Sequence, residues 1–224
     1  MKLLIGIPTG GTPTRGFIDA LSALALPASV TSSERVVWTG NFVPAQREMI
    51  ARDAVRLDVD YVAMLDDDVV VPRDALIRLL DVLQRDPGAA ISGAFCGTSD
   101  SNSLAATSGT LSALSEGPVR VDGLGFACVV LRVAALRALE LPYFAAHVYV
   151  DSATRTLRQC NEDHMLCLRM RKAGYRVVLH AGVRACRERA IGADCPQAQV
   201  SFPFETVQLQ ANGPREARAR RERE

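Results

Sequence analysis

The 224-residue sequence lacks several features that would assign it at once to a class of protein. No apolar run reaches the roughly 18 residues of a membrane-spanning helix. The short run Leu3–Ile7 meets Pro8 before it could act as a signal peptide. We therefore expect no membrane span and a cytoplasmic location. The six cysteines form no CxxC pair, which favours free thiols over zinc ligands or disulfides.

The sequence also lacks a large net charge. The 26 lysine and arginine residues and 25 aspartate and glutamate residues leave a formal net charge of +1. The overall charge therefore gives no indication of binding to nucleic acid. A content of 48% hydrophobic and 23% charged residues is typical of a globular protein. We expect one domain at 1–204 and a charged tail at 205–224, because residues 213–224 are rich in arginine and glutamate and have no apolar stripe.

The sequence does contain three aspartates directly after an apolar strand. Asp66, Asp67 and Asp68 follow the apolar run Tyr61–Leu65. In an extended backbone the first and third of these side chains point to the same side, and paired carboxylates suit a hard divalent ion that also binds substrate phosphates. The pattern predicts a metal and phosphate site. The alternative is that one aspartate caps the helix opened by Pro72.

Strands and helices alternate along the first half of the chain. The apolar spacing predicts strands at 2–7 and 35–39 and helices at 17–24, 45–57 and 76–83, and the apolar run 61–65 is the third strand. Three such units in succession predict an α/β fold, with a mostly parallel central sheet and helices on both faces. Ligands of such sheets bind beyond the carboxyl ends of the strands, where Pro8, Thr39 and Asp66 lie.

The second half is less regular. Its expected elements are strands at 89–95, 126–131 and 175–179, a loop or weak hairpin at 96–118 and a helix at 161–173. Asn161 is the expected helix cap, and Glu162 and Asp163 fall in the first turn, where the helix dipole favours acids. General acid–base chemistry also requires such a pair, so these two acids are candidate catalytic residues.

In their order and spacing, these motifs resemble those of the nucleotide-sugar glycosyltransferases of the GT-A fold, and within them the broad family 2 group. The resemblance covers about residues 2–187. It is carried by Leu3–Thr9, Arg47, Asp66–Asp68, Gly123–Phe126 and Glu162–Tyr175. It implies a single GT-A-like, Rossmann-like domain, with a donor-nucleotide half at about 1–95 and an acceptor half at about 96–204.

The resemblance also implies an activity. A family member moves a sugar from a nucleoside-diphosphate sugar to a hydroxyl acceptor, which is a glycan, a lipid-linked molecule or a small molecule. By position, Pro8, Thr9 and Thr39 would line the pocket for the nucleobase and ribose. Arg47 would reach the base or the diphosphate.

The acidic motifs match two further family features. Asp66 and Asp68 resemble the DxD motif that holds Mn²⁺ or Mg²⁺ on the donor diphosphate, with Asp67 beside the donor. Asp163, next to Glu162, resembles the general base that deprotonates the acceptor hydroxyl in inverting members.

One departure from the family pattern concerns the metal ligand. The family commonly has a histidine some two dozen residues after the second acidic pair, and Arg187 lies near that place. Three explanations are open: His180 supplies the ligand from an earlier position, the coordination shell differs, or Arg187 itself offsets diphosphate charge. A second departure is Glu48, which stands where an asparagine usually follows the helix arginine.

Two other functions fit parts of the sequence. Asp66–Val70 also matches the nucleophile motif of haloacid-dehalogenase-like phosphatases. Those enzymes need a lysine before a second acidic motif, but Lys172 follows Glu162 and the other lysine is Lys2. The third interpretation is a nucleotide-sugar binding protein that has lost catalysis. The donor sugar, the acceptor, the stereochemistry and the oligomeric state have no signature in the sequence.

Overall fold

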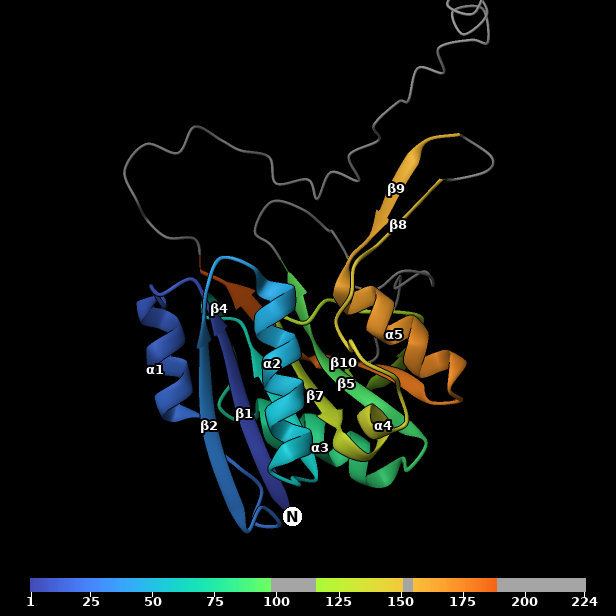
Figure 1. The fold of residues 1–224 in the computed structure, drawn as a ribbon. Coiled ribbons are helices and arrows are strands. Elements are labelled where there is room, and N and C mark those ends of the chain that lie inside the picture. Colours follow the sequence, from blue (N-terminus) through green and yellow to red (C-terminus); the bar gives the residue numbers. More distant parts are fainter. Residues whose placement is uncertain (98–115, 151–154, 189–224) are drawn as a thin grey trace, which may run out of the picture.

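The computed structural model describes residues 1–97, 116–150 and 155–188 (Figure 1). Within these residues one eight-stranded sheet has the order β2-β1-β3-β7-β5-β10-β4, with β6 paired to β10. Most of the loop expected at 96–118 and the whole tail expected at 205–224 lie outside the described residues. No helix among the described residues is long and apolar enough to cross a membrane.

The elements of the first half follow the expected order. They are β1 (Lys2–Thr9), α1 (Arg15–Ala23), β2 (Ser32–Thr39), α2 (Val43–Arg56), β3 (Tyr61–Leu65), β4 (Val69–Val70) and α3 (Ala75–Arg85). β1 lies between β2 and β3 and pairs with both in parallel. The carboxyl ends of β1, β2 and β3 therefore meet at one edge of the sheet.

The second half adds the remaining strands and two helices. They are β5 (Ala89–Gly97), β6 (Pro118–Val121), β7 (Cys128–Arg132), α4 (Val133–Arg137), β8 (His147–Val150), β9 (Leu157–Cys160), α5 (Glu162–Lys172) and β10 (Arg176–Arg187). β7 runs antiparallel between β3 and β5, and β10 runs parallel to β5 but antiparallel to β4 and β6. Five of the eight strands thus share one direction, which confirms the mostly parallel sheet.

Apolar side chains cover both faces of the sheet. Alternate residues of a strand point to opposite faces, so Leu4 and Met64 pack under α2, α4 and α5, whereas Leu3 and Leu65 pack under α1 and α3. Figure 1 shows α1 and α2 on opposite sides of β1. The expectation of helices on both faces is confirmed.

The three aspartates lie in a turn, so the expectation of an extended backbone at this point is wrong. β3 ends at Leu65, and the N–H of Val69 donates to the carbonyl oxygen of Asp66 at 3.2 Å. The N–H of Asp66 still donates to the carbonyl of Ala127, 3.0 Å away. Aspartate favours turns because its short side chain hydrogen-bonds nearby backbone. The turn sets Asp68 off the strand and starts β4 at Val69.

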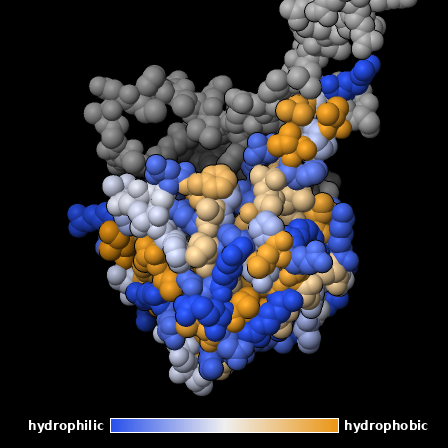
Figure 2. All heavy atoms as spheres, viewed as in Figure 1, coloured by the Kyte–Doolittle hydropathy of each residue, from blue (hydrophilic) through white to orange (hydrophobic). Residues whose placement is uncertain are grey.

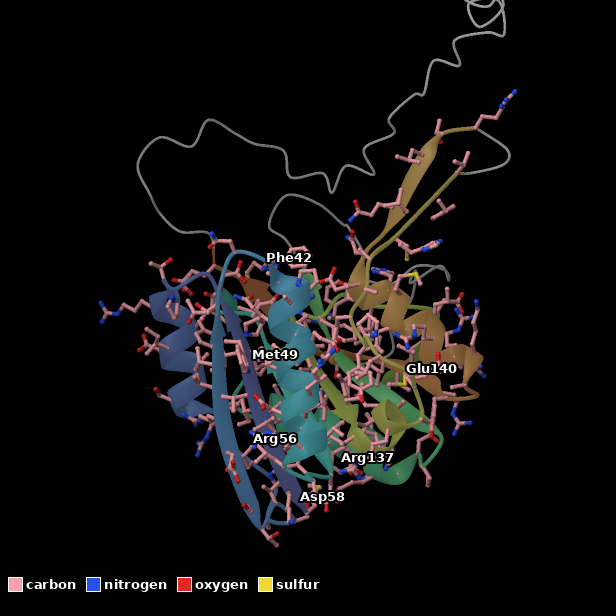
Figure 3. All side chains as sticks on the ribbon, in the orientation of Figure 1. Phe42, Met49, Arg56, Asp58, Arg137 and Glu140 are labelled. Carbon is pink, nitrogen blue, oxygen red and sulfur yellow. The ribbon has the colours of Figure 1, made fainter. Side chains whose placement is uncertain are left out.

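A two-stranded hairpin, β8–β9, projects from the body of the protein (Figure 1). Its first strand carries Val148, Tyr149 and Val150, whose exposed fractions are 53%, 44% and 57%. Figure 2 shows hydrophobic spheres over this hairpin. Figure 3 shows two further exposed apolar side chains, Phe42 and Met49, along the outward side of α2.

The five cysteines within the described residues are free thiols: Cys96, Cys128, Cys160, Cys167 and Cys186. Two of them, Cys128 and Cys167, are buried. Cys195 lies outside the described residues. Burial raises the pKa of Cys128 and of Cys167 to about 12. Both thiols therefore stay protonated and unreactive at neutral pH.

A close approach between β1 and α2 depends on Gly6. A Cβ atom at this position would lie 2.2 Å from Cγ2 of Ile50, which is fully buried on α2. This methyl group is bonded directly to the Cβ of Ile50 and cannot move away without shifting the helix, so only glycine fits here. Gly10, at the end of the same strand, has nothing within 4 Å of the corresponding position.

We expect Gly6→Ala to lower the free energy of unfolding by about 1–3 kcal/mol, the usual cost of overpacking a core. Gly10→Ala is the matched control and should change it by less than about 0.5 kcal/mol. Urea denaturation of both variants measures the two values. Equal stability of the two variants would contradict the close packing of α2 on β1.

Candidate functional site

Side chains from five elements meet at the carboxyl edge of the sheet. Thr9 ends β1, Asp66 follows β3, and Arg187 ends β10. Arg47 lies in the first half of α2, and Glu162 is the first residue of α5. The edge is the place where open α/β sheets bind ligands.

Opposite charges alternate in a chain of ion pairs across this edge. Glu162 Oε1 lies 2.7 Å from Arg47 Nη1, and Arg47 Nη2 lies 2.8 Å from Asp66 Oδ1. The other oxygen of Asp66, Oδ2, lies 2.7 Å from Arg187 Nη2. Nη1 of Arg187 donates to both carboxylate oxygens of Asp68, at 2.6 and 2.8 Å. We call these five residues the ion-pair chain.

Three consecutive members of the ion-pair chain, from Glu162 to Asp66, are largely buried. The side chains of Arg47, Asp66 and Glu162 are 6%, 11% and 12% exposed. Burial alone would lower the pKa of Arg47, but the charges of Asp66 and Glu162 outweigh it and the pKa is raised. Burial raises the pKa of Glu162, and Arg47 offsets part of that shift. Arg47 thus stays charged and holds both acids in place.

Strand pairing places Arg187 beside the acidic turn. At its end, β10 runs antiparallel to β4, so Cys186 lies opposite Val70 and Arg187 opposite Val69. The N–H of Glu188 donates to the carbonyl oxygen of Asp68 at 2.7 Å. The backbone therefore fixes the guanidinium against the two carboxylates. Burial acts to lower the pKa of Arg187, but the carboxylates of Asp66 and Asp68 raise it on balance.

Asp67 points to the loop after β1 instead. Its Oδ2 accepts hydrogen bonds from the hydroxyl of Thr9 and, at 3.3 Å, from the N–H of Gly10. Its carbonyl oxygen accepts the N–H of Thr14 at 2.9 Å, next to the start of α1. Asp67 therefore shapes the loop in which Thr9 lies. A direct contact of Asp67 with a donor stays a prediction.

The expected nucleobase residues differ in exposure. Pro8 and Thr9 are buried, whereas Thr39, opposite Thr9 in the register of β1 and β2, is exposed. Gln46, which the sequence analysis did not single out, joins the two strand ends: its Nε2 donates to the carbonyls of Thr9 at 2.7 Å and Gly40 at 3.0 Å. Gln46 Oε1 is buried, with no hydrogen-bond partner among the described residues.

Glu48 explains one departure from the family pattern. Its Oε2 accepts the N–H groups of Tyr143 and Phe144 at 2.7 and 2.9 Å, and its Oε1 accepts Arg52 Nε at 2.7 Å. The side chain thus anchors the segment before β8 to α2. This is a structural role. A glutamate reaches these N–H groups, and the sequence alone gave no signal of them.

Asp163 forms a pair with His164, the next residue of α5. Asp163 Oδ1 lies 3.0 Å from His164 Nδ1, and the side chains are 15% and 29% exposed. Burial would raise the pKa of Asp163, but hydrogen bonds and charge from His164 lower it on balance. The same hydrogen bond raises the pKa of His164. Asp163 is therefore ionised at neutral pH.

The structure does not bring His180 to the acidic turn. The sequence predicts that this strand ends at Leu179. In the structure β10 continues to Arg187, so His180 lies in the middle of the strand. His180 pairs with Ala94 of β5, on the other side of a register shift in β10 from Arg187. His180 lies near the charged residues of α3, and burial and Arg78 lower its pKa. Its Nδ1 is buried, with no hydrogen-bond partner among the described residues.

The arrangement of the two acids does not fit a divalent ion. All four carboxylate oxygens of Asp66 and Asp68 accept hydrogen bonds from guanidinium groups, three from Arg187 and one from Arg47. Among the described residues, no three histidine, cysteine, aspartate or glutamate side chains form a group that could hold a metal. The guanidinium of Arg187 occupies the position that an ion would need.

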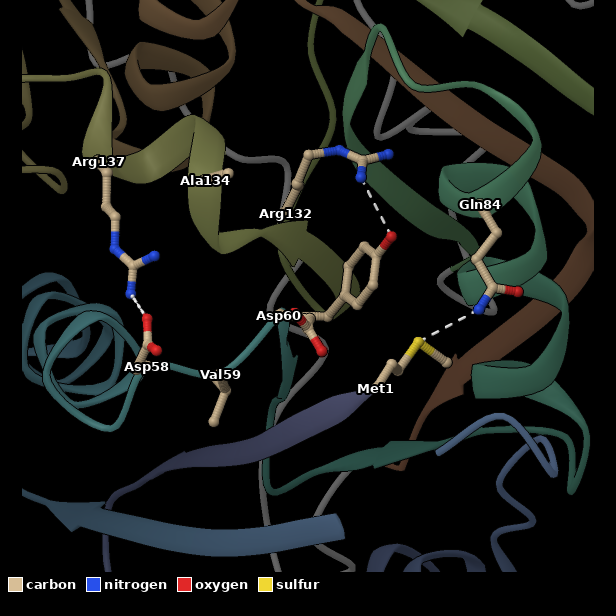
Figure 4. A pocket seen from close by; sticks show the side chains of 9 residues that line it. Met1, Asp58, Val59, Asp60, Gln84, Arg132, Ala134 and Arg137 are labelled. Carbon is tan, nitrogen blue, oxygen red and sulfur yellow. Dashed lines mark hydrogen bonds and ion pairs between the residues drawn. The ribbon is translucent and has the colours of Figure 1, made fainter. Parts of the chain in front are cut away.

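A hollow of about 390 Å³ lies elsewhere, around the start of β3 (Figure 4). Its charged side chains already have internal partners. Arg132 donates to the hydroxyl of Tyr61 at 3.1 Å and to the carbonyl of Ala89 at 3.1 Å, and Arg137 pairs with Asp58. None of the residues predicted for the site lines this hollow. It therefore offers no comparable constellation of reactive groups.

Comparison with known proteins gives a likeness in fold. No family model matches the chain, and no curated protein matches its sequence. The structure is similar to A197 from STIV, with a TM-score of 0.59, 17% identity, and coverage of 83% of this chain and 84% of that one.

Two further similar structures were solved with UDP ligands. GalNAc-T7 with UDP, GalNAc and Mn²⁺ has a TM-score of 0.57 at 8% identity, covering 84% of this chain and 44% of that one. S. aureus TarS 1–349 with UDP-GlcNAc has a TM-score of 0.54 at 12% identity, covering 84% and 59%. At these identities the likeness shows the fold alone, and that fold is GT-A-like.

We expect the pKa values of His164 and His180 to be shifted in opposite directions. His164 should have a pKa above the ordinary value of 6.5 and His180 a pKa below it. Because protonated His164 is favoured in the folded state, its stabilising effect is complete below pH 6.5 and is lost as the pH rises through its folded pKa.

NMR titration of the three histidines measures these values, with His164→Gln and His180→Gln to assign the signals. Asp163→Asn should lower the pKa of His164 and leave that of His180 unchanged. A His164 pKa that does not respond to Asp163→Asn would contradict the pairing.

Proposed function

We propose that this protein is a glycosyltransferase that moves a sugar from a nucleoside-diphosphate sugar to a hydroxyl acceptor. The observation that carries the proposal is the ion-pair chain. It joins the two acidic motifs, Asp66–Asp68 and Glu162–Asp163, through Arg47 at the carboxyl edge of a GT-A-like sheet. These motifs lie about 95 residues apart in the sequence, and a donor and an acceptor site have to adjoin for group transfer.

The donor side of the proposed site lies at the ends of β1, β2 and β3. The nucleoside would lie against Thr9 and the exposed Thr39, and the diphosphate would lie near Asp66 and Arg187. Arg47 holds Asp66 and is itself buried, so it acts as a positioning residue in the structure as described. Guanidinium groups suit diphosphate oxygens because they offer paired N–H donors.

The acceptor side is proposed to lie at the start of α5. In the transfer, the bond between the anomeric carbon and the diphosphate oxygen breaks, and a bond from the acceptor oxygen to that carbon forms. The nucleoside diphosphate leaves with the bonding electrons, and the proton of the acceptor hydroxyl goes to the carboxylate of Asp163. Asp163 is suited to this role because its lowered pKa keeps it ionised, and His164 holds its orientation.

Mn²⁺ or Mg²⁺ at Asp66 and Asp68 was expected from the sequence. A bound ion of this kind would offset charge on the leaving diphosphate. In the structure, however, guanidinium groups hold all four of those oxygens. The proposed function therefore includes no step that depends on the ion.

The phosphatase alternative receives no support from the site. An aspartate nucleophile needs a carboxylate oxygen free to attack phosphorus. Both oxygens of Asp66 are held, Oδ1 by Arg47 and Oδ2 by Arg187. The third interpretation is a binding protein without catalysis. Measurement of turnover distinguishes it from the proposed glycosyltransferase.

Incubation with labelled UDP-, GDP- and dTDP-sugars tests the activity. We expect slow release of the nucleoside diphosphate from one of these donors with water as acceptor, and faster release with a suitable hydroxyl acceptor. Binding of a donor without any release would identify a binding protein. Release of phosphate from a simple aryl phosphate, with no reaction of the donors, would contradict the proposal in favour of a phosphatase.

Asp163→Asn should lower the rate of transfer at least about 100-fold, the usual contribution of a general base, and leave donor affinity nearly unchanged. Asp19→Asn is the control, because Asp19 is an exposed acid on α1. Initial rates and donor binding are measured on the same preparations. A fall of less than about tenfold would assign Asp163 to the helix start alone.

A further inference from the structure

We propose that Arg187 replaces the divalent ion in this protein, so that the nucleoside diphosphate binds without a metal. The inference rests on the proposed function and concerns how the same site holds its diphosphate. Its basis is the position of one guanidinium between two carboxylates that the sequence presents as metal ligands. Arg187 Nη2 lies 2.7 Å from Asp66 Oδ2, and Nη1 lies 2.6 Å from Asp68 Oδ1.

Arg187 and a bridging ion exclude each other. An ion shared by Asp66 and Asp68 needs at least one oxygen from each carboxylate. Arg187 binds both oxygens of Asp68 and one of Asp66, and Arg47 binds the fourth. An ion could bind only after the guanidinium of Arg187 had moved away. The positive charge of Arg187 would then need another acidic partner.

The backbone around Arg187 keeps the guanidinium where it is. The residue pairs with Val69 in the ladder between β10 and β4. The next residue, Glu188, donates its N–H to Asp68 at 2.7 Å and accepts the N–H of Gly16 at 2.7 Å through its carboxylate. Glu188 thus ties the end of β10, next to Arg187, to the acidic turn and to the start of α1.

The guanidinium still has hydrogen-bonding capacity for a ligand. It carries five N–H groups, and its three hydrogen bonds to Asp66 and Asp68 come from Nη1 and Nη2 alone. Within the described part of the chain, Nε makes no hydrogen bond. The side chain is 35% exposed, so part of it is accessible to a ligand, and guanidinium N–H groups suit phosphate oxygens.

The charges of the ion-pair chain agree with this assignment. Asp66, Asp68 and Glu162 contribute three negative charges, and Arg47 and Arg187 contribute two positive charges, which leaves −1. Without Arg187 the sum would be −2, on two carboxylates with vacated oxygens. Such a site attracts a divalent ion. Removal of Arg187 should therefore create the metal site that the sequence leads one to expect.

Binding of Mn²⁺ alone tests the position of Arg187 independently of any nucleotide. Isothermal titration compares the full chain with Arg187→Gln and with Arg184→Gln, an exposed arginine on the same strand. Arg187→Gln should bind Mn²⁺ at least about tenfold more tightly than the wild type, and Arg184→Gln should match the wild type. Equal or tighter binding by the wild type would overturn the proposal.

Binding of UDP, GDP and dTDP in EDTA and in Mn²⁺ tests the consequence. The nucleotide that binds should do so with affinities within about threefold in the two conditions, and Arg187→Gln should weaken its binding in EDTA at least about tenfold. Arg184→Gln should not. A nucleotide that binds the wild type only with Mn²⁺ would overturn the inference but support the proposed function. No binding under either condition would contradict the proposed function, and the Mn²⁺ comparison would still decide the position of Arg187.

Arg187→Lys provides a second variant should Arg187→Gln unfold. The ammonium keeps a positive charge between the carboxylates but loses the planar donor pair. This variant should therefore keep the weak Mn²⁺ binding of the wild type and lose part of the nucleotide affinity. Tight Mn²⁺ binding by a folded Arg187→Lys variant would contradict the claim that the positive charge at position 187 keeps the ion out.

Discussion

The site depends on the carboxylate of Asp66, which is buried between two guanidinium groups. A buried carboxylate is costly unless it is paired and hydrogen-bonded, and here each oxygen has its own arginine at 2.7–2.8 Å. Arg47 comes from α2, and Arg187 comes from the end of β10. One charged group thus links the first and second halves of the chain. Loss of either arginine would leave Asp66 with an unpaired oxygen.

The sheet brings these partners together because several strands end at the same edge. β1 and β3 are parallel neighbours, and β10 reaches the same region through β5 and β4. The acidic turn joins β3 to β4, and in it Asp66 contacts both α2 and the end of β10, whereas Asp68 contacts the end of β10. Gly6 lets α2 approach closely enough for Arg47 to reach both Asp66 and Glu162.

Local patterns predicted the fold well, because each strand and helix repeats its apolar residues with its own period. The acidic motifs were also visible, since charges at the end of an apolar strand are conspicuous in a sequence. The partners of these acids were not, because Arg187 and Asp68 are 119 residues apart and meet only through strand pairing. His180 was misplaced for the same reason: the length of β10 depends on its pairing with β4, β5 and β6.

Hydrogen–deuterium exchange with the nucleotide that binds, measured in EDTA, tests the central claim most directly. Backbone protection reports where a ligand lies and whether it needs a metal to lie there. The account predicts protection of the loop after Thr9 and of the turn at Asp66, and no change around Asp58 and Arg132. Protection around Asp58 and Arg132 alone, or protection of the acidic turn that appears only when Mn²⁺ is added, would contradict it.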